Sequence, residues 1–196
     1  MNNKNNNIIK NNPVLVGGLG FVSILAATTT LKSALIMSAA VLAVLILSSF
    51  VTSILKNFIP VKLEDLTLLI IIGAFASVAT MLIKFYYPIS ESTMKLAASL
   101  IVVNSVIFYN LKDTALHASL GQSLKTSILA GLAYGLVAIL MGTIRELFGI
   151  GTVYGFRIIP EKYTIPTFSS PVIGFILLGL LIGLGSYFAN TKKEDQ

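Results

Sequence analysis

Residues 34–55 read ALIMSAAVLAVLILSSFVTSIL, which is 22 consecutive positions without a charged side chain. An α-helix needs about 20 apolar residues to cross a hydrocarbon core about 30 Å thick. This segment is therefore long enough and apolar enough to span a lipid bilayer as one helix. It predicts an integral membrane protein.

The composition of the whole chain supports the same prediction. Of 196 residues, 55% are apolar and 11% are charged, against about 25% charged in an ordinary soluble domain. So few charges cannot cover a soluble globule, and the chain is too apolar to be disordered. Basic cytoplasmic loops explain the net charge of +6, so no nucleic-acid partner is expected. Because the chain has no cysteine, it offers by itself no disulfide and no thiolate ligand for a metal or an iron–sulfur cluster.

Apolar stretches recur along the chain and predict an all-α membrane protein with six transmembrane helices. The six stretches are Pro13–Leu31, Ala34–Leu55, Leu66–Ile83, Leu96–Tyr109, Leu124–Ile144 and Pro171–Ala189. They form one membrane domain over residues 13–190, between a disordered cytoplasmic tail at residues 1–12 and a polar C-terminal tail at residues 191–196. A cleavable signal peptide is the alternative for the first stretch, but the apolar pattern that follows favours an anchored helix.

Two of the six stretches are unusual. The first is interrupted by Gly17, Gly18 and Gly20, and the fourth has only about 14 apolar residues before Asn110, which is short for a full span. Each is the first stretch of one half of the chain. Short or glycine-broken segments in corresponding positions indicate two inverted three-helix repeats, with a functional centre between the broken helices.

The lysine and arginine residues at the helix ends are divided almost evenly between the two sides of the membrane. With a cytoplasmic N-terminus, eight lie on the cytoplasmic side and six on the other. Because positive loops stay in the cytoplasm, both termini are expected there. So small a bias also fits a protein that meets a homologous partner of opposite orientation.

Arg145 and Glu146 follow the fifth stretch directly. A charged side chain at membrane depth is costly and is therefore a functional candidate. Adjacent side chains on a helix point about 100° apart, so each is expected to find its own partner on a neighbouring helix or helix end. They would then fix helix geometry or gate ions. The alternative is a snorkelling arginine at the interface and a solvated glutamate.

Other polar residues give weaker signals. Asn104 lies inside the fourth stretch, and an asparagine at that depth usually reaches another helix. His117 is expected to be solvated in a loop, since the sequence holds no second histidine for a metal site. The sequence contains no Walker loop, no nucleophile elbow and no His/Cys metal spacing. We predict no catalytic residue and no metal site, and a chain that moves or conducts something or supports a partner that does.

Three ordered motifs carry a family resemblance. The first is Asn12-Pro13-Val14-Leu15-Val16, followed by Leu19-Gly20 and Leu25-Ala26. The second is Leu100-Ile101-Val102-Val103-Asn104, and the third is Gly142-Thr143-Ile144-Arg145-Glu146 with Gly149, Gly151-Thr152 and Gly155-Phe156. Together they resemble the family that contains the E subunit of the Rnf electron-transport complex and the D subunit of the sodium-pumping NADH:quinone reductase.

The resemblance implies a six-helix inverted-repeat subunit in an ion-translocating electron-transport complex. It implies a homologous, inverted partner resembling the A-type Rnf protein, and further partners resembling the C, D and G proteins of that complex. In this family each of the two paired subunits supplies one cysteine from its first helix and one from its fourth. The four thiolates hold a [2Fe–2S] cluster at mid-membrane. The chain would be a non-catalytic subunit of such a translocase.

This sequence departs from the family at the cluster ligands. Val22 stands at the position of the first family cysteine, and Ser105 stands at the position of the second. Valine cannot ligate iron, and a serine alkoxide is a poor substitute for a soft thiolate. We therefore expect no cofactor on this chain. We place the site at the two facing broken helices, with Val22 and Ser105 at its centre, Asn104 in the contact, and Arg145 and Glu146 at the half-helix ends.

Two other functions remain open from the sequence. One is the substrate-binding membrane subunit of an energy-coupling-factor transporter, which has a similar length and also six helices, but lacks the Gly-Thr-Ile-Arg-Glu spacing. The other is a purely structural assembly subunit. The sequence names neither the ion nor anything held between the broken helices.

Overall fold

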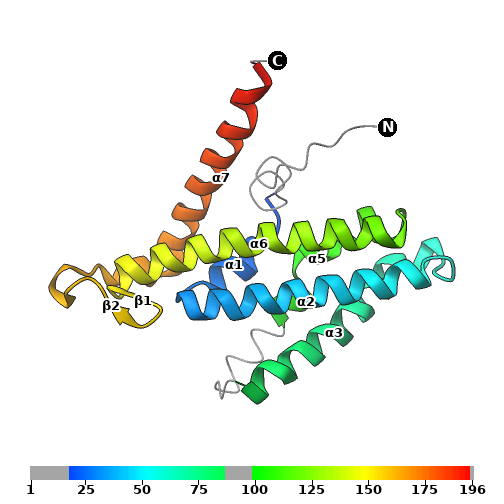
Figure 1. Cartoon of the computed structure of the whole chain (residues 1–196), viewed down its shortest axis with the longest axis horizontal. Helices are drawn as coiled ribbons and strands as arrows, with labels where there is room; N and C mark the ends of the chain where they lie inside the picture. The colour runs from blue at the N-terminus through cyan, green and yellow to red at the C-terminus, as the bar shows by residue number, and fades with distance from the viewer. Residues whose placement is uncertain (1–17, 87–98, 195–196) are drawn as a thin grey trace.

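The computed structural model describes residues 18–86 and 99–194, and Figure 1 shows the path of the chain. The cytoplasmic tail expected at residues 1–12 lies outside the described residues, as do the starts of the first and fourth apolar stretches.

Six α-helices account for most of the described residues. They are α1 (Phe21–Ala27), α2 (Leu31–Leu55), α3 (Glu64–Tyr86), α5 (Ser105–Asn110), α6 (Leu120–Gly149) and α7 (Pro171–Glu194). In this part of the chain three helices are long and apolar enough to cross a membrane, namely α2, α3 with the turn before it, and α6. The prediction of a helical membrane protein is therefore confirmed.

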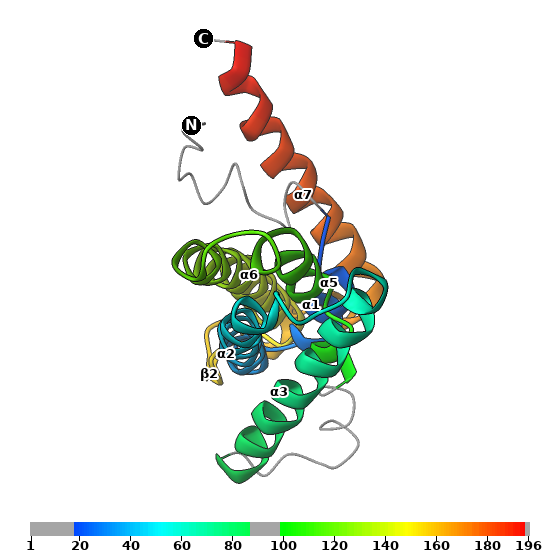
Figure 2. The ribbon, with the colours of Figure 1, turned by 90° about the vertical axis from the view of Figure 1, so that its right-hand side faces the viewer.

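Helices α2 and α6 lie side by side and antiparallel, and they form the body of the molecule in both views (Figure 1, Figure 2). Glycines on α6 allow the close approach. Gly131 packs on Leu42, Gly135 lies against Ser38, and Gly142 lies against Ala34. Small residues at a membrane helix interface let two backbones come together and gain van der Waals packing. This helix pair is the scaffold to which the buried polar groups of the molecule are attached.

Both helices are longer than the apolar stretches that predicted them. Helix α2 begins at Leu31 because Thr30 caps it: Thr30 Oγ1 accepts from the Ser33 amide at 3.2 Å, and Ser33 Oγ accepts from the Thr30 amide at 3.3 Å. Helix α6 runs to Gly149, so Arg145 and Glu146 lie inside the helix and not just beyond it. Charged residues marked the predicted ends, and they are poor boundaries where their side chains are buried with polar partners.

The first and fourth stretches form only short helices in the described region. Helix α1 has seven residues and starts after Gly20, whose φ of +78° is left-handed. A Cβ on Gly20 would also lie 2.9 Å from Val106 Cγ2, so both the backbone conformation and the space favour glycine there. Helix α5 has six residues and starts after Asn104, and a π-helical segment, Leu111–Ala115, follows it. Each helix therefore begins directly after a non-helical residue, Gly20 for α1 and Asn104 for α5. We call these two interruptions of the helical backbone the breaks.

The last part of the chain adds two features. Strands β1 (Thr152–Val153) and β2 (Phe156–Arg157) form a small antiparallel hairpin, a minor addition to the predicted all-α class. Its two-residue turn, Tyr154 and Gly155, has positive φ at both positions, as a tight hairpin turn requires. Helix α7 then projects away from α2 and α6 in both views (Figure 1, Figure 2).

The close approach of α2 and α6 leads to a direct prediction. In Gly142→Ala the new Cβ would lie 2.8 Å from Ala34 Cβ and 3.2 Å from the Thr30 carbonyl oxygen, so the helices must move apart. We expect the free energy of unfolding to fall by about 1–3 kcal/mol, as in other overpacked cores. Gly73→Ala on α3 is the matched control, since its Cβ would meet nothing within 4 Å. Thermal unfolding in detergent measures both variants, and equal melting temperatures would contradict the packing.

Candidate functional site

The two backbone breaks lie against each other. Although they are 85 residues apart in the sequence, the Gly20 amide donates to Ser105 Oγ at 2.8 Å. Asn104 Nδ2 donates to Ser23 Oγ at 3.1 Å, which joins the same two breaks a second time. Short helices α1 and α5 therefore start from one shared point in the molecule.

Ser23 is the centre of this junction. Its hydroxyl donates to the Gly20 carbonyl at 2.9 Å and accepts from Asn104 Nδ2 and, at 3.0 Å, from the Tyr134 hydroxyl. Asn104 also accepts from the Val106 amide at 3.0 Å, so it caps the start of α5. Ser23, Asn104 and Tyr134 are all buried, and Tyr134 ties the junction to α6. The sequence signal of an asparagine at depth pointed to Asn104, but nothing in the sequence indicated Tyr134.

Val22 and Ser105, in contrast, face outward. Val22 is 69% exposed and Ser105 is exposed, although the residues next to them form the buried junction. Ser105 also lines an open groove of about 490 Å³, whose other lining residues are Leu19, Phe108, Tyr109, Lys112, Asp113 and His117. The two positions that the resemblance singles out are therefore on the surface of this chain, beside the break.

Arg145 is buried, with 1% of its surface exposed, and reaches two helix ends. Nη1 donates to the Leu25 carbonyl at 2.8 Å and to Thr28 Oγ1 at 3.3 Å, at the end of α1. On the other side Nη2 donates to the Ser169 carbonyl at 2.7 Å, just before α7 begins. Longer contacts go to the carbonyls of Phe168 and Ser170. The guanidinium thus lies among carbonyl oxygens, and the negative end of the α1 dipole favours its charge.

Glu146 is 3% exposed and points to a different helix end. Its Oε2 accepts from the Leu31 amide at 2.6 Å, at the first residue of α2. Its Oε1 accepts from Thr152 Oγ1 at 2.9 Å and from the Gly155 amide at 3.0 Å, in the hairpin. A carboxylate at a helix N-terminus is favoured by the free amides and the helix dipole. Arg145 therefore does not snorkel to the membrane interface and Glu146 is not solvated, because both side chains are buried and hydrogen-bonded.

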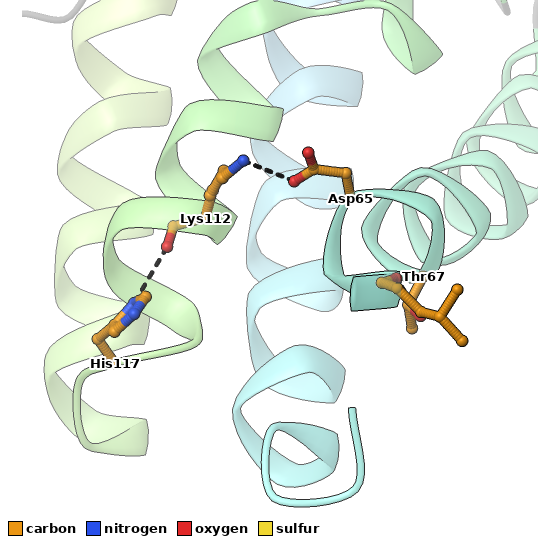
Figure 3. A network of polar contacts seen from close by, with 5 residues as sticks. Asp65, Thr67, Lys112 and His117 are labelled. Carbon is orange, nitrogen blue, oxygen red and sulfur yellow. Dashed lines mark hydrogen bonds and ion pairs between the residues drawn. The ribbon is translucent and has the colours of Figure 1, made fainter. Parts of the chain in front are cut away.

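A network of polar contacts includes two of the residues that line the groove, Lys112 and His117 (Figure 3). Lys112 Nζ and Asp65 Oδ1 form an ion pair at 2.7 Å, which joins the π-helical segment to the start of α3. His117 is exposed in the turn that follows, and its Nδ1 lies 3.2 Å from the Lys112 carbonyl oxygen. Thr67 Oγ1 donates to the Leu63 carbonyl. No sequence signal indicated the Asp65–Lys112 pair, because its members lie 47 residues apart.

The residues that the resemblance places at the cluster positions do not fit an iron–sulfur cluster. Val22 offers no donor atom, and the Ser105 hydroxyl already accepts from the Gly20 amide. Among the described residues no three His, Cys, Asp or Glu side chains lie together in a way that could hold a metal ion. Without a cysteine, the chain has no thiolate to offer a cluster.

The sequence is similar to known membrane proteins over nearly its whole length. Residues 2–182 match the family described as Rnf-Nqr subunit, membrane protein. The D subunit of a Na⁺-translocating NADH-quinone reductase from Chlamydia pneumoniae is 40% identical, over 94% of this chain and 92% of the relative. The E subunit of the Na⁺-translocating ferredoxin:NAD⁺ oxidoreductase complex from Acetobacterium woodii is 32% identical, over 98% of both chains. The D subunit of the reductase from Pseudoalteromonas atlantica is 33% identical, over 96% of this chain and 91% of the relative.

These matches cover both broken helices and the Arg145–Glu146 segment. Matches at this level of identity and coverage, together with the membrane-helical fold, assign the chain. It belongs to the Rnf-Nqr family of membrane subunits.

Proposed function

We propose that this chain is a non-catalytic membrane subunit of a Na⁺-translocating electron-transport complex of the Rnf/Nqr type, and that it holds no iron–sulfur cluster. The observation that carries the proposal is the junction of the two breaks, which buries Ser23 and Asn104 and leaves Val22 and Ser105 on the surface. Residues placed in this way can be reached by a second protein. We take the ion, Na⁺, and the electron-transport reaction in this proposal from the names of the relatives.

The partner at this surface is a homologous membrane protein of opposite orientation, resembling the A-type Rnf protein. An apolar surface around the junction supports this, since Val22 and Val103 are largely exposed there. We propose six spans arranged as two inverted repeats. The antiparallel packing of α2 on α6 supports it, because these are the second helices of the two halves. Proteins resembling Rnf C, D and G complete the complex, in a bacterial cytoplasmic membrane with both termini of this chain in the cytoplasm.

Arg145, Glu146 and Asn104 serve as positioning residues in this proposal. Arg145 joins the end of α1 to the start of α7, Glu146 joins the start of α2 to the hairpin, and Asn104 joins the two breaks. They hold the surface around Val22 and Ser105 in one shape for a partner. In this proposal the chain keeps the fold of an electron-transfer subunit but lacks the thiolates that would hold a cluster.

Site-directed cross-linking tests this function, because the natural chain has no cysteine to remove first. Val22→Cys and Ser105→Cys place a single thiol beside the junction, and Met81→Cys places one on α3, where Met81 is 73% exposed. Each variant is labelled with a photoreactive maleimide in native membranes, and the cross-linked species are identified by mass spectrometry. We expect positions 22 and 105 to capture a homologous membrane protein of the complex and position 81 not to capture it.

Other cross-linking outcomes would overturn the proposal. Capture of an ATPase pair with its transmembrane coupling protein would identify an energy-coupling-factor transporter. Equal labelling of the homologous partner from positions 22, 105 and 81 would show that the junction is not the interface.

A further inference from the structure

A second polar cluster lies away from the junction, buried between α2, α6 and the end of α5. All of its side chains are uncharged hydroxyls or amides, and all are buried. We call it the hydroxyl cluster, and its members are Ser49, Thr52 and Ser53 on α2, Asn110 at the end of α5, and Ser123 and Ser127 on α6.

The centre of the hydroxyl cluster is a set of three oxygens from three segments. Ser49 Oγ and Ser127 Oγ are hydrogen-bonded at 2.5 Å across the α2–α6 interface. Ser127 Oγ donates to Asn110 Oδ1 at 2.8 Å, and Ser49 Oγ lies 3.5 Å from the same atom. Ser53 Oγ donates to the Ala115 carbonyl at 3.3 Å, so the cluster extends to the π-helical segment.

Two members of the hydroxyl cluster are buried without a partner. Thr52 Oγ1 and Ser123 Oγ make no hydrogen bond within the described residues, and both residues have 0% exposure. Thr52 lies three residues after Ser49 and Ser123 lies four before Ser127, so each shares a helix face with a member of the central set. Several other buried hydroxyls bond back along their own helix, as Thr80 does to Ala76 at 3.0 Å, although Ser48 Oγ and Ser170 Oγ, outside the cluster, are also buried without a partner. Because buried polar groups are nearly always satisfied, these two indicate a bound species.

The backbone beside the cluster departs from a regular α-helix. In the π-helical segment the hydrogen bonds are displaced, as in the bond from the Leu116 amide to the Leu111 carbonyl at 3.1 Å. Such segments occur frequently at functional sites in helices. In transporters, unwound carbonyls and the C-terminal ends of half-helices coordinate Na⁺. Here the segment directly follows the short helix α5.

We propose that the hydroxyl cluster binds one monovalent cation, with Ser49, Thr52, Asn110, Ser123 and Ser127 offering the oxygens. Hard cations take oxygen ligands. The ligand set carries no charge, so it suits a monovalent ion better than a divalent one, whose burial among neutral groups is far more costly. The choice of Na⁺ rests on the proposed function. The site adds to that function a binding position for the transported ion on this chain.

Na⁺-dependent stability of the full-length chain in detergent tests the site. The melting temperature is measured in NaCl and in choline chloride at equal ionic strength. A ligand that binds only the folded state at about 100 times its Kd should raise the melting temperature by about 5–10 °C. We expect this rise in the natural chain and in Thr52→Ser, which keeps the hydroxyl. We expect its loss in Thr52→Val, which has nearly the same shape, and in Ser127→Ala.

Thr52→Val also separates the site from a purely structural cluster. Removing an unpartnered buried hydroxyl should leave stability in choline chloride unchanged or higher, so loss of the Na⁺ response would not arise from misfolding. Ser77→Ala on α3 is the control, because Ser77 is exposed and its replacement should leave the response intact.

Two results would overturn the cation site. One is a melting temperature equal in the two salts, as expected if the cluster holds only water. The other is an unchanged Na⁺ response in both Thr52→Val and Ser127→Ala. The proposed function would survive either result, because the cross-linking at Val22 and Ser105 tests it separately.

Discussion

Arg145→Met is expected to lower the free energy of unfolding by about 3–5 kcal/mol, the largest effect that we expect from any single substitution. The guanidinium is 1% exposed and donates to the Leu25 and Ser169 carbonyls at 2.8 and 2.7 Å. Methionine fills much of the volume but leaves those carbonyls buried without a donor. Arg145→Lys should give an intermediate loss of stability, because one ammonium group cannot replace a guanidinium whose two terminal nitrogens reach the end of α1 and the start of α7. Thermal unfolding in detergent measures the loss.

Arg157→Met is the matched control for Arg145. Arg157 is exposed and pairs with Glu161 at 3.3 Å on the surface, a kind of pair worth about 0–1 kcal/mol. We expect its melting temperature to stay within a few degrees of the natural chain. A similar, small loss in both variants would mean that Arg145 does not hold the ends of α1 and α7 in place.

Glu146→Ala is expected to cost about 2–4 kcal/mol and to reduce the amount of assembled complex. The carboxylate accepts from the Leu31 amide, Thr152 Oγ1 and the Gly155 amide, and alanine leaves all three donors without it. Glu146→Gln should be nearly as harmful, because the side-chain NH₂ of glutamine would face one of these three donors and cannot accept a hydrogen bond from it. Hydrogen exchange at Leu31 and Gly155 should increase in both variants.

Glu161→Gln provides the control for the carboxylate. Glu161 has an 81% exposed side chain, so loss of its charge should change neither exchange at Leu31 nor assembly. If Glu146→Gln assembled fully and kept slow exchange at both amides, the role of Glu146 at the start of α2 would be refuted.

The sequence predicted the parts of the fold that depend on local pattern. An uncharged run such as residues 34–55 can hardly be anything but a long apolar helix, and α2 follows it closely. The glycines before Phe21 and the shortness of the fourth stretch predicted the interrupted segments, and α1 and α5 are short. Both signals arise from the backbone itself, so no knowledge of neighbouring helices was needed.

The remaining features depend on contacts between distant residues. Arg145 and Glu146 were identified as costly charges, but the ends of α1 and α2 that they reach lie more than a hundred residues away in the sequence. The same holds for Tyr134, whose partner Ser23 is 111 residues distant. Serines such as Ser49 and Ser127 carry no sequence signal, because hydroxyls in membrane helices usually bond to their own backbone. Only the packing of α2 on α6 brings them together.

Iron content and the reduced-state EPR spectrum of the purified complex test the central claim, that this chain is an Rnf-Nqr membrane protein without a cluster ligand. The clusters that the cysteines of the partner proteins can hold are counted first. We predict no further [2Fe–2S] signal and an unchanged spectrum in Ser105→Ala, since Val22 and Ser105 supply no thiolate. An additional [2Fe–2S] signal that disappears in Ser105→Ala would contradict the claim and would place a cluster on this chain.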